Sequence, residues 1–373
     1  MKRVLHLIKE YTGNYPLLNE LVKGLPRDRY GSIVCYLSGR SDGKNELESI
    51  ALEVSYLGFS RKYTKHIRPG LIVALAKLVR SRNIDIIHCH RHKATIIGTV
   101  AAMLAGTPHV VSHVHGLART RSLGRRFTNW MIFKRMKRIV AVSDTVKQDI
   151  VSSNWGVDSS KVVTVRNGIN LRLVDQRAIS KREARLRLGI TDNDFVFGTV
   201  GRLTNTKGHA YLLTAFSEIR ERIRSARLLL IGDGPLRSSL EQRADELGIS
   251  AYVSFLGYRN DVLELLRGID VFVFPSLAEG LPLALLEAMG SRLPVIASRV
   301  GGIPEILGES NCGILIPPKD VNALSAGMST IGLLNEEARR EMGNAARKRV
   351  EDMFTVEQMS KALEAVYESI DSK

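Results

Sequence analysis

The sequence EGLPLALLE, residues 279–287, places two glutamates at the ends of a seven-residue stretch that is mostly apolar. It follows an apolar run at 269–274 that is closed by Pro275, and an apolar pattern with helical spacing continues through Met289. This order predicts a strand, a turn that holds Glu279, and a helix. In α/β domains ligands bind at such turns, because helix N-termini and free backbone N–H groups meet there.

Apolar strands alternate with helical segments on both sides of this stretch, which indicates a doubly wound parallel sheet in each half. The expected strands lie at 3–8, 32–37, 84–89, 109–114 and 138–142 in the first half, and at 195–200, 228–231, 252–255, 269–274, 295–297 and 313–316 in the second. Residues 167–192 are polar and weakly periodic, so we expect a linker there. A helical pattern at 355–370 closes the chain, and its docking site stays open.

Length and composition are those of a globular protein with two domains. The chain has 373 residues, 44% of them hydrophobic and 25% charged, and one domain typically takes ~150 residues. No window approaches the ~18 uninterrupted apolar residues of a membrane span. The three cysteines are widely spaced, which excludes a disulfide framework and favours a reducing, cytosolic compartment.

The net charge of +16 is concentrated in the first half of the chain. Residues 1–190 hold 34 Lys and Arg against 13 Asp and Glu, whereas residues 191–373 hold 20 against 25. Residues 119–138 contain eight basic and no acidic side chains, interleaved with apolar ones. This pattern fits a basic amphipathic helix on an anionic membrane surface, or an ordinary helix whose apolar side faces the core. No nucleic-acid-binding motif is present, so we expect no nucleic-acid partner.

A glycine-bracketed loop, GRLTNTKG at 201–208, follows the strand at 195–200. Backbone N–H groups, a helix N-terminus and the cations Arg202 and Lys207 together favour an anion such as a diphosphate. Two solvated cations on a loop are the alternative. The nearby GDGP at 232–235 lacks the third glycine of a dinucleotide fingerprint, which disfavours a nicotinamide-dependent dehydrogenase.

Two tracts contain the residue types of a metal site. Residues 192–194 have a D-x-D pattern, but Asp and Asn are also favoured in polar turns. In HCHRH at 88–92, His88 and His90 would share one face of a strand while the cysteine between them points away. A strand end that lines a cleft is therefore favoured over a metal site. His113 and His115 repeat this arrangement at the end of the strand expected at 109–114.

The spacing of the two glutamates constrains their chemistry. If Glu279 and Glu287 lie at the ends of one helix, eight residues separate their backbones by ~12 Å. The carboxyl pair of a glycoside hydrolase lies only ~5 to 9.5 Å apart across one bond. The two glutamates would instead suit two ends of one extended ligand, with a sugar at one end and a ribose at the other.

With these residues in view, EGLPLALLE resembles the E-x7-E element of the retaining glycosyltransferases of family 4. That family has the GT-B fold, in which two Rossmann-like domains face each other across a cleft. The second half of the chain carries further matches in the family's order: Asn167-Gly168-Ile169-Asn170, Gly201 to Gly208, Gly232-Asp233-Gly234-Pro235, Pro275-Ser276 and Gly301-Gly302-Ile303-Pro304-Glu305. The first half matches more loosely, through His115-Gly116 and the loop at Gly13.

The resemblance implies a role for each matching residue of the second half. Arg202 and Lys207 would hold the donor diphosphate, Glu279 would contact the donor sugar, and Glu287 would bind the ribose. The backbone between the glutamates would meet the sugar and the phosphate at Gly280, Leu281, Pro282 and Leu283.

Two sites of the first half carry implied roles as well. His115 would line the reacting centre, and the loop at Gly13 would bind the donor. Many relatives have a second glycine where this chain has Asn14, which can adopt unusual backbone angles and could hydrogen-bond a ligand but is less suited to close backbone approach to a phosphate. The expected catalytic residues are Arg202, Lys207, Glu279 and His115.

We therefore expect a retaining transfer of a hexose-type sugar from a nucleotide-diphosphate donor to a hydroxyl of a polysaccharide, lipopolysaccharide or lipid-linked acceptor. No metal or other cofactor is expected. Residues 1–170 would form the acceptor-side domain, residues 171–354 the donor-binding domain, and residues 355–373 a final helix. The expected location is the cytoplasm, with peripheral contact at the inner face of the membrane. The alternatives are a sugar-nucleotide epimerase or phosphorylase on this fold, or a non-catalytic sugar- or lipid-binding scaffold.

Overall fold

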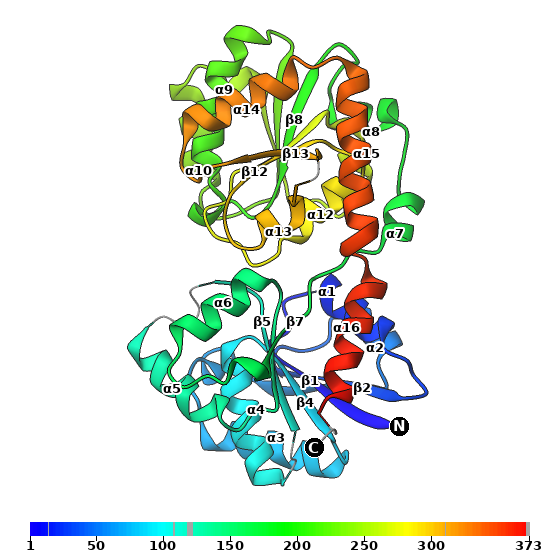
Figure 1. Cartoon of the computed structure of the whole chain (residues 1–373), viewed down its shortest axis with the longest axis vertical. Coiled ribbons are helices and arrows are strands. Elements are labelled where there is room, and N and C mark those ends of the chain that lie inside the picture. Colours follow the sequence, from blue (N-terminus) through cyan, green and yellow to red (C-terminus); the bar gives the residue numbers. More distant parts are fainter. Residues whose placement is uncertain (14, 107–108, 118–121, 310, 371–373) are drawn as a thin grey trace. The chain divides into compact units, whose positions relative to one another are not determined.

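The structure, a computed structural model, describes residues 1–13, 15–106, 109–117, 122–309 and 311–370. The chain divides into two compact units (Figure 1). The first unit comprises Met1–Gly168 together with Val356–Lys373, and the second comprises Ile169–Thr355. Each unit is built on one parallel sheet.

The first unit contains a seven-stranded sheet in the order β3-β2-β1-β4-β5-β6-β7. Its strands are β1 (Lys2–Glu10), β2 (Tyr30–Ser38), β3 (Glu53–Phe59), β4 (Ile86–His90), β5 (His109–Val114), β6 (Arg138–Ala141) and β7 (Val162–Thr164). Its α-helices are α1 (Pro16–Gly24), α2 (Leu47–Ile50), α3 (Pro69–Ser81), α4 (His92–Ala105), α5 (Leu123–Phe133), α6 (Asp144–Ser153) and α16 (Val356–Glu368).

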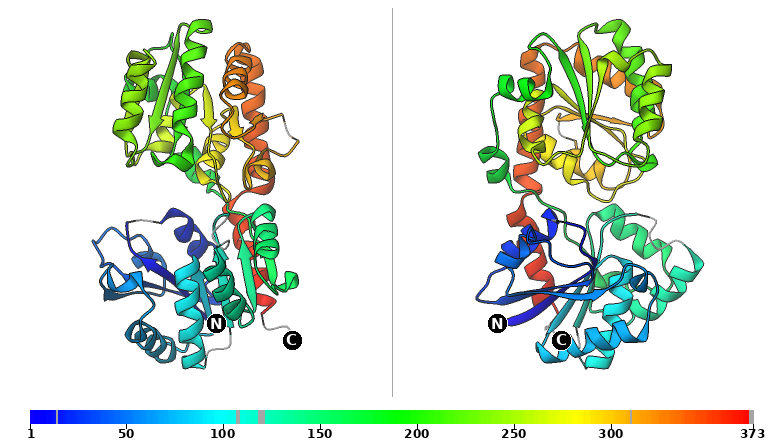
Figure 2. Two further views of the ribbon diagram at one scale, coloured as in Figure 1. Left: turned by 90° about the vertical axis from the view of Figure 1, so that its left-hand side faces the viewer. Right: turned by 180° about the vertical axis from the view of Figure 1, so that it is seen from behind.

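Helices cover both faces of this sheet (Figure 2), which explains its near-continuous apolar strands. Neighbouring residues of β4 face opposite helices. The Cys89 side chain packs beside Gly98 of α4, whereas His88 Nδ1 lies 2.5 Å from the Tyr367 hydroxyl of α16. The strand therefore carries its histidines on the α16 face, as its alternation predicts.

The second unit contains a six-stranded sheet in the order β10-β9-β8-β11-β12-β13. Its strands are β8 (Phe195–Val200), β9 (Ala226–Ile231), β10 (Val253–Gly257), β11 (Val271–Phe274), β12 (Val295–Ser298) and β13 (Gly313–Ile316). Its α-helices are α7 (Leu171–Gln176), α8 (Lys181–Leu188), α9 (His209–Arg222), α10 (Arg237–Glu246), α11 (Val262–Leu265), α12 (Leu283–Gly290), α13 (Ile303–Leu307), α14 (Val321–Gly332) and α15 (Glu336–Met353).

A buried apolar cluster of the second unit joins β8, β9 and β11 to α9 and α14. Phe197 and Phe216 meet edge to face in it, with ring centroids 6.4 Å apart. Burying such apolar surface is the main stabilising contribution to folding. The carboxyl ends of β8 and β11, where the glycine-rich loop and the glutamate turn begin, are thus fixed by this core.

The stretch expected as a linker, residues 167–192, is only in part a connection, because it contains α7 and α8. Arg185 of α8 is buried and its guanidinium lies 2.8 Å from the Asp270 carboxylate, an ion pair that ties α8 into the second unit. The units divide at Gly168 and Ile169, inside that stretch and two residues before the expected boundary.

The last helix, α16, belongs to the first unit and packs against α1. Arg29 forms ion pairs with Glu364 and Glu368, and the Arg138 guanidinium donates to the Ser369 hydroxyl at 2.9 Å. The helix therefore returns to the unit that contains the N-terminus. Among the described residues, the helices are all too short or too polar to cross a bilayer.

Candidate functional site

The glycine-bracketed loop lies at the carboxyl end of β8. A 3-10 turn, Asn205–Lys207, is followed by Gly208, whose φ of +69° belongs to the left-handed region. A Cβ atom at Gly208 would lie 2.0 Å from the Pro275 carbonyl oxygen. Only glycine therefore lets this loop pack against the end of β11, and Leu277 N–H donates across it to Thr206 at 2.7 Å.

A lysine–glutamate pair joins this loop to the glutamate turn. Lys207 Nζ lies 2.6 Å from Glu279 Oε1, and the two side chains are only 24% and 12% exposed. The same ammonium lies 4.9 Å from the centre of the Phe274 ring, at the end of β11. Partial burial strengthens this pair beyond a surface salt bridge, and it holds one cation and one anion at a single point.

The glutamate turn is also held by its own backbone. Gly301 has a φ of +55°, and a Cβ atom there would lie 2.0 Å from the Glu279 carbonyl oxygen. Gly302 N–H donates to the Gly280 carbonyl at 2.7 Å. The segment before α13 thus packs directly against the turn and fixes the backbone position of Glu279.

The helix of the EGLPLALLE stretch begins later than the ~12 Å estimate assumed. α12 starts at Leu283 with Pro282 at its N-cap, so Glu279 precedes the helix and only Glu287 lies on it. A distance based on helical rise therefore does not apply to the pair. Burial raises the pKa of Glu287 to about 7, because desolvation penalises the ionised carboxylate.

A pocket of about 420 Å³ opens beside Arg202, at the carboxyl ends of β8 and β9. Its lining residues are Val200, Gly201, Arg202, Ile231, Gly232, Asp233, Tyr258, Arg259 and Val262. Two glycines bring the loops around it together: a Cβ atom at Gly232 would lie 2.1 Å from the Gly201 carbonyl oxygen, and one at Gly234 would lie 2.4 Å from that of Leu203. The GDGP motif therefore serves close packing of backbones.

The first unit has a larger pocket of its own, about 640 Å³, next to Gly13. Four cationic side chains line it: Lys9, Arg91, Lys93 and Arg125. Its one lining carboxylate, that of Glu10, forms an ion pair with Arg61. Arg91 has a φ of +73°, a strained conformation for a residue other than glycine, directly before α4. The pocket therefore favours an anionic ligand.

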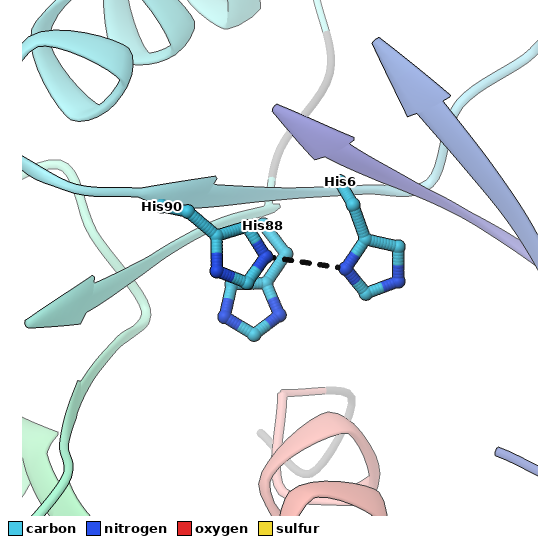
Figure 3. Close-up of side chains that lie close together, drawn as sticks. All are labelled: His6, His88 and His90. Atoms are coloured by element: carbon cyan, nitrogen blue, oxygen red, sulfur yellow. Dashed lines mark hydrogen bonds between the residues drawn. The ribbon is translucent and has the colours of Figure 1, made fainter. Parts of the chain in front are cut away.

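Five histidines form an array on one face of the first sheet: His6 of β1, His88 and His90 of β4, and His113 and His115 at the end of β5. His90 Nε2 lies 3.4 Å from His6 Nδ1, the contact drawn in Figure 3, and its Nδ1 lies 3.4 Å from His115 Nε2. His88 Nε2 lies 3.2 Å from His113 Nδ1. The nitrogens thus form two rows of short contacts, one through His6, His90 and His115 and one through His88 and His113.

The interior histidines of this array are neutral at pH 7. Burial lowers the pKa of His6 to about 4 and that of His113 to about 3. Burial, and then the neighbouring imidazoles, hold the pKa of His88 and of His90 well below the usual range. Each neutral ring offers one N–H donor and one acceptor nitrogen.

Comparison with known proteins places both units in one family. The model of Glycosyltransferase Family 4 matches residues 17–173, and that of Glycosyl transferases group 1 matches residues 180–349. The UDP-Gal:alpha-D-GlcNAc-diphosphoundecaprenol alpha-1,3-galactosyltransferase of Escherichia coli is 31% identical over 295 residues, 76% of this chain and 75% of that protein. The chain belongs to the family 4-type glycosyltransferases. It is thus an enzyme that uses a nucleotide sugar, and retention is the stereochemistry typical of its family.

Other relatives agree with this placement of the glycosyltransferase. The N-acetyl-alpha-D-glucosaminyl L-malate synthase of Bacillus anthracis is 28% identical over 80% of this chain and 78% of its own length. The crystal structure of Anabaena Alr3699/HepE in complex with UDP superposes with a TM-score of 0.84 at 21% identity, over 99% of this chain and 100% of that one. The expected GT-B fold is confirmed.

The second unit of the glycosyltransferase brings most of the expected site residues together. Lys207 contacts Glu279, the backbone from Gly280 to Leu283 continues the same turn, and Arg202 lies on the Lys207 loop beside the 420 Å³ pocket. In the part of the chain that the structure describes, no side-chain hydrogen bond joins the Glu287 carboxyl to these residues. Their roles toward a donor stay predictions.

The remaining expected residues lie in the first unit. Gly13 lines the 640 Å³ pocket, and His115 lies at the edge of the histidine array. Asn14 lies outside the described residues, as do Arg119 and Arg121 of the basic stretch, so the substitution of the second loop glycine stays untested.

Sequence reasoning missed the contribution of three residues to these sites. Phe274 contacts Lys207, Gly301 packs against the Glu279 turn, and His6 belongs to the histidine array. Phe274 was visible only as the last residue of an apolar strand. His6 lies on the first strand in register with His88, so correct strand pairing would have found it. Gly301 belongs to a motif whose contact partner is far away in the chain.

The absence of a metal stays a prediction for this glycosyltransferase. Two histidine triplets, His6-His88-His90 and His90-His113-His115, bring their ring nitrogens within 4.8 Å of one another. A metal lies in the plane of each imidazole that binds it, but His88 and His90 are stacked 4.6 Å apart with planes only 17° from parallel. This packing favours hydrogen bonds. At 192–194, Asp194 accepts from Thr191 and pairs with Arg227, as a turn residue does.

Proposed function

We propose that this glycosyltransferase moves a hexose from a UDP-hexose to a hydroxyl of a lipid-linked saccharide, with retention at the anomeric carbon and without a bound metal. The observation that carries the proposal is the Lys207–Glu279 pair, held by glycine contacts at the carboxyl ends of β8 and β11. The printed names of relatives support the substrate classes: one uses UDP-galactose on a diphosphoundecaprenol-linked sugar, and Anabaena HepE binds UDP-glucose.

In this reaction the bond between the anomeric carbon and the diphosphate oxygen breaks, and negative charge develops on the diphosphate. The Lys207 ammonium and the Arg202 guanidinium would neutralise that charge. Electrostatic stabilisation lowers the barrier most at the atoms where charge develops in the transition state. These two cations supply the charge that a divalent ion supplies in other enzymes. Glu279 would accept hydrogen bonds from hydroxyls of the hexose and fix its orientation.

Glu287 would bind the ribose of the donor. An ionised carboxylate accepts hydrogen bonds from both ribose hydroxyls, whereas its protonated form loses part of that capacity. Because burial raises the pKa of Glu287 to about 7 in the free enzyme, donor affinity should rise as the pH passes from 6 to 8.

The first unit would bind the acceptor. Its residues 1–168 and 356–373 hold 30 Lys and Arg against 15 Asp and Glu, whereas residues 169–355 hold 24 against 23. The cationic 640 Å³ pocket would receive an acidic group of the acceptor, such as the diphosphate of a lipid-linked sugar. The charge of this unit and the chemistry of the pocket thus point to the same acceptor class.

A patch on α5 would hold the first unit at an anionic membrane surface. It consists of four apolar side chains of α5 and one of a neighbouring loop: Leu123, Phe127, Trp130, Met131 and Trp155, all exposed. Lys134 Nζ lies 4.0 Å from the Trp130 ring centre, and the Arg126 guanidinium carbon lies 4.7 Å from that of Trp155. Apolar side chains surrounded by cations suit a peripheral protein on the inner membrane face.

Product analysis tests the proposed reaction. The whole protein is incubated with UDP-hexose labelled with ¹³C at the anomeric carbon and with a short-chain polyprenyl-diphosphate sugar. We expect release of UDP and a new glycosidic bond with the anomeric configuration of the donor, seen by NMR. Isomerised UDP-hexose, a sugar 1-phosphate, or donor binding with no turnover would each contradict the proposal.

A further inference from the structure

We propose that His6 and His90 set the tautomer of His115, through a one-way chain of hydrogen bonds that places the hydrogen of His115 on Nδ1 and leaves its Nε2 as an acceptor. His6 and His90 are positioning residues in this scheme. The functional part of the inference rests on the proposed transfer reaction and on the role at its reacting centre that the family resemblance implies for His115.

The three rings are joined end to end. The ring centres of His6 and His90 are 5.7 Å apart and those of His90 and His115 also 5.7 Å, while the bonded nitrogens are 3.4 Å apart in both pairs. The nitrogens therefore lie close to the lines between ring centres. The ring planes differ by only 25° and 23°, so each lone pair faces the nitrogen of the next ring.

A second row of rings holds the first in place. His88 stacks on His90 with centroids 4.6 Å apart, and His113 stacks on His115 at 4.3 Å. His88 is itself bonded to His113 at 3.2 Å and to the Tyr367 hydroxyl of α16 at 2.5 Å. Rings fixed on their faces cannot rotate freely, which preserves the nitrogen contacts of the first row.

The direction of the chain follows from one buried nitrogen. His6 Nε2 is fully buried and has no hydrogen-bond partner among the described residues. A buried N–H group without an acceptor is rarer and costlier than an unused lone pair, so this nitrogen carries the lone pair. His6 therefore has its hydrogen on Nδ1, where it faces His90 (Figure 3).

The remaining tautomers follow in sequence. His90 accepts at Nε2 and, because it is neutral, must carry its hydrogen on Nδ1. It then donates to His115 Nε2, so His115 has its hydrogen on Nδ1. A ligand contact of His115 through Nδ1 is then a donated hydrogen bond, and His115 cannot take a proton at Nε2 without breaking its bond to His90.

The direct test is the ring-nitrogen spectrum of the intact protein. The chain has nine histidines, so ¹⁵N labelling of histidine and long-range ¹H–¹⁵N correlation resolve each tautomer. We expect the Nδ1–H form for His6, His90 and His115 at pH 7. An Nε2–H form of any of the three would overturn the proposal, as would binding of one equivalent of Zn²⁺ with loss of the His6 and His90 N–H signals.

Two substitutions at one position separate positioning from packing. His6→Phe removes the first donor, whereas His6→Asn keeps an N–H near the position of Nδ1. We expect His6→Phe to convert His115 to a mixture of tautomers and to lower kcat on the order of tenfold, with the KM for donor within about twofold. His6→Asn should restore both the His115 signal and kcat.

His109→Gln is the matched control, since His109 lies on the same strand as His113 but at its other end, and it should change neither signal nor kcat. An unchanged His115 tautomer in His6→Phe would overturn the inference. Full activity of His115→Ala would contradict the proposed role of His115 instead, and would leave the tautomer result intact. The two failures are therefore distinguishable.

Discussion

The two units build their candidate sites by different means. In the second unit, backbone meets backbone: Gly208, Gly232 and Gly301 each lie where a Cβ atom would come within 2.1 Å of a carbonyl oxygen. In the first unit, side chains meet side chains, through the histidine array and a pocket lined by four cations. The two units also differ in net charge, which is +15 for the first unit and +1 for the second.

This difference suggests how one fold serves many substrates. A site fixed by glycine contacts tolerates few changes, which suits a ligand with an invariant part such as a diphosphate. A site built from side chains changes its chemistry by substitution while the backbone stays in place. The second unit would therefore carry what the family shares, and the first would carry what distinguishes this enzyme.

The largest effect should come from breaking the ion pair of the second unit. We expect Lys207→Met and Glu279→Ala each to lower kcat for transfer by about 10² to 10³, because each removes a group that meets the donor as charge develops. Steady-state kinetics of the whole protein measure this. Lys181→Ala is the control, since Lys181 Nζ also lies 2.6 Å from a carboxylate, that of Asp270. A wild-type kcat for Lys207→Met would contradict the role assigned to Lys207.

The glycine contacts predict the next effect. Gly301→Ala should lower the free energy of unfolding by about 3 kcal/mol, from a positive φ and from the clash with the Glu279 carbonyl. Gly248→Ala should cost only ~1 kcal/mol, because Gly248 has a φ of +67° but no described atom within 4 Å of its Cβ position. Urea unfolding of both variants checks the difference, and equal losses would remove the close-approach argument.

The buried carboxyl of α12 predicts a pH-dependent effect. Because the pKa of Glu287 is about 7 in the folded protein against an ordinary glutamate pKa of 4.5, the folded protein binds this proton more tightly than the unfolded chain does. This contribution is complete below pH 4.5 and is lost as the pH rises through 7. At pH 8 Glu287→Gln should therefore be more stable than wild type by on the order of 2 kcal/mol, and at pH 4.5 nearly equal. Melting curves of wild type and Glu287→Gln at both pH values measure this difference in stability. A difference that is the same at pH 4.5 and at pH 8 would contradict the raised pKa of Glu287.

The smallest effect concerns the apolar patch of the first unit. Phe127→Ser combined with Met131→Ser should weaken binding to phosphatidylglycerol-containing vesicles by about tenfold. Leu186→Ser, which changes an 81% exposed leucine of the second unit, should leave it unchanged. Vesicle sedimentation measures both variants. Equal binding by wild type and the double variant would remove the membrane proposal.

The alternating pattern of the chain predicts most of the fold. β5, β8 and β13 begin and end where the sequence predicts, because each is a compact apolar run with clear ends. β3 and β7 were missed, since both are edge strands and neither is a continuous buried run. α8, KREARLRL, has too few apolar residues to be predicted, and it becomes stable through tertiary contacts such as that of Arg185 with Asp270.

The candidate site could be predicted only where its parts are local in sequence. The loop of Lys207 and the turn of Glu279 each show glycine or proline punctuation beside a strand. Their direct contact depends on β8 lying next to β11, which local periodicity does not encode. For the same reason, local sequence does not predict the hydrogen bond between His6 and His90 or the close approach of Gly301 to the Glu279 carbonyl.

Calorimetric titration with UDP and with UDP-hexose tests the central claim most directly, that the second unit binds the donor with Lys207 at the diphosphate and Glu279 at the sugar. We expect Lys207→Met to weaken both ligands by at least about tenfold. Glu279→Gln should weaken UDP-hexose alone, because UDP has no hexose for Glu279 to contact. Equal losses for the two ligands in Glu279→Gln, or unchanged UDP binding in Lys207→Met, would contradict the account.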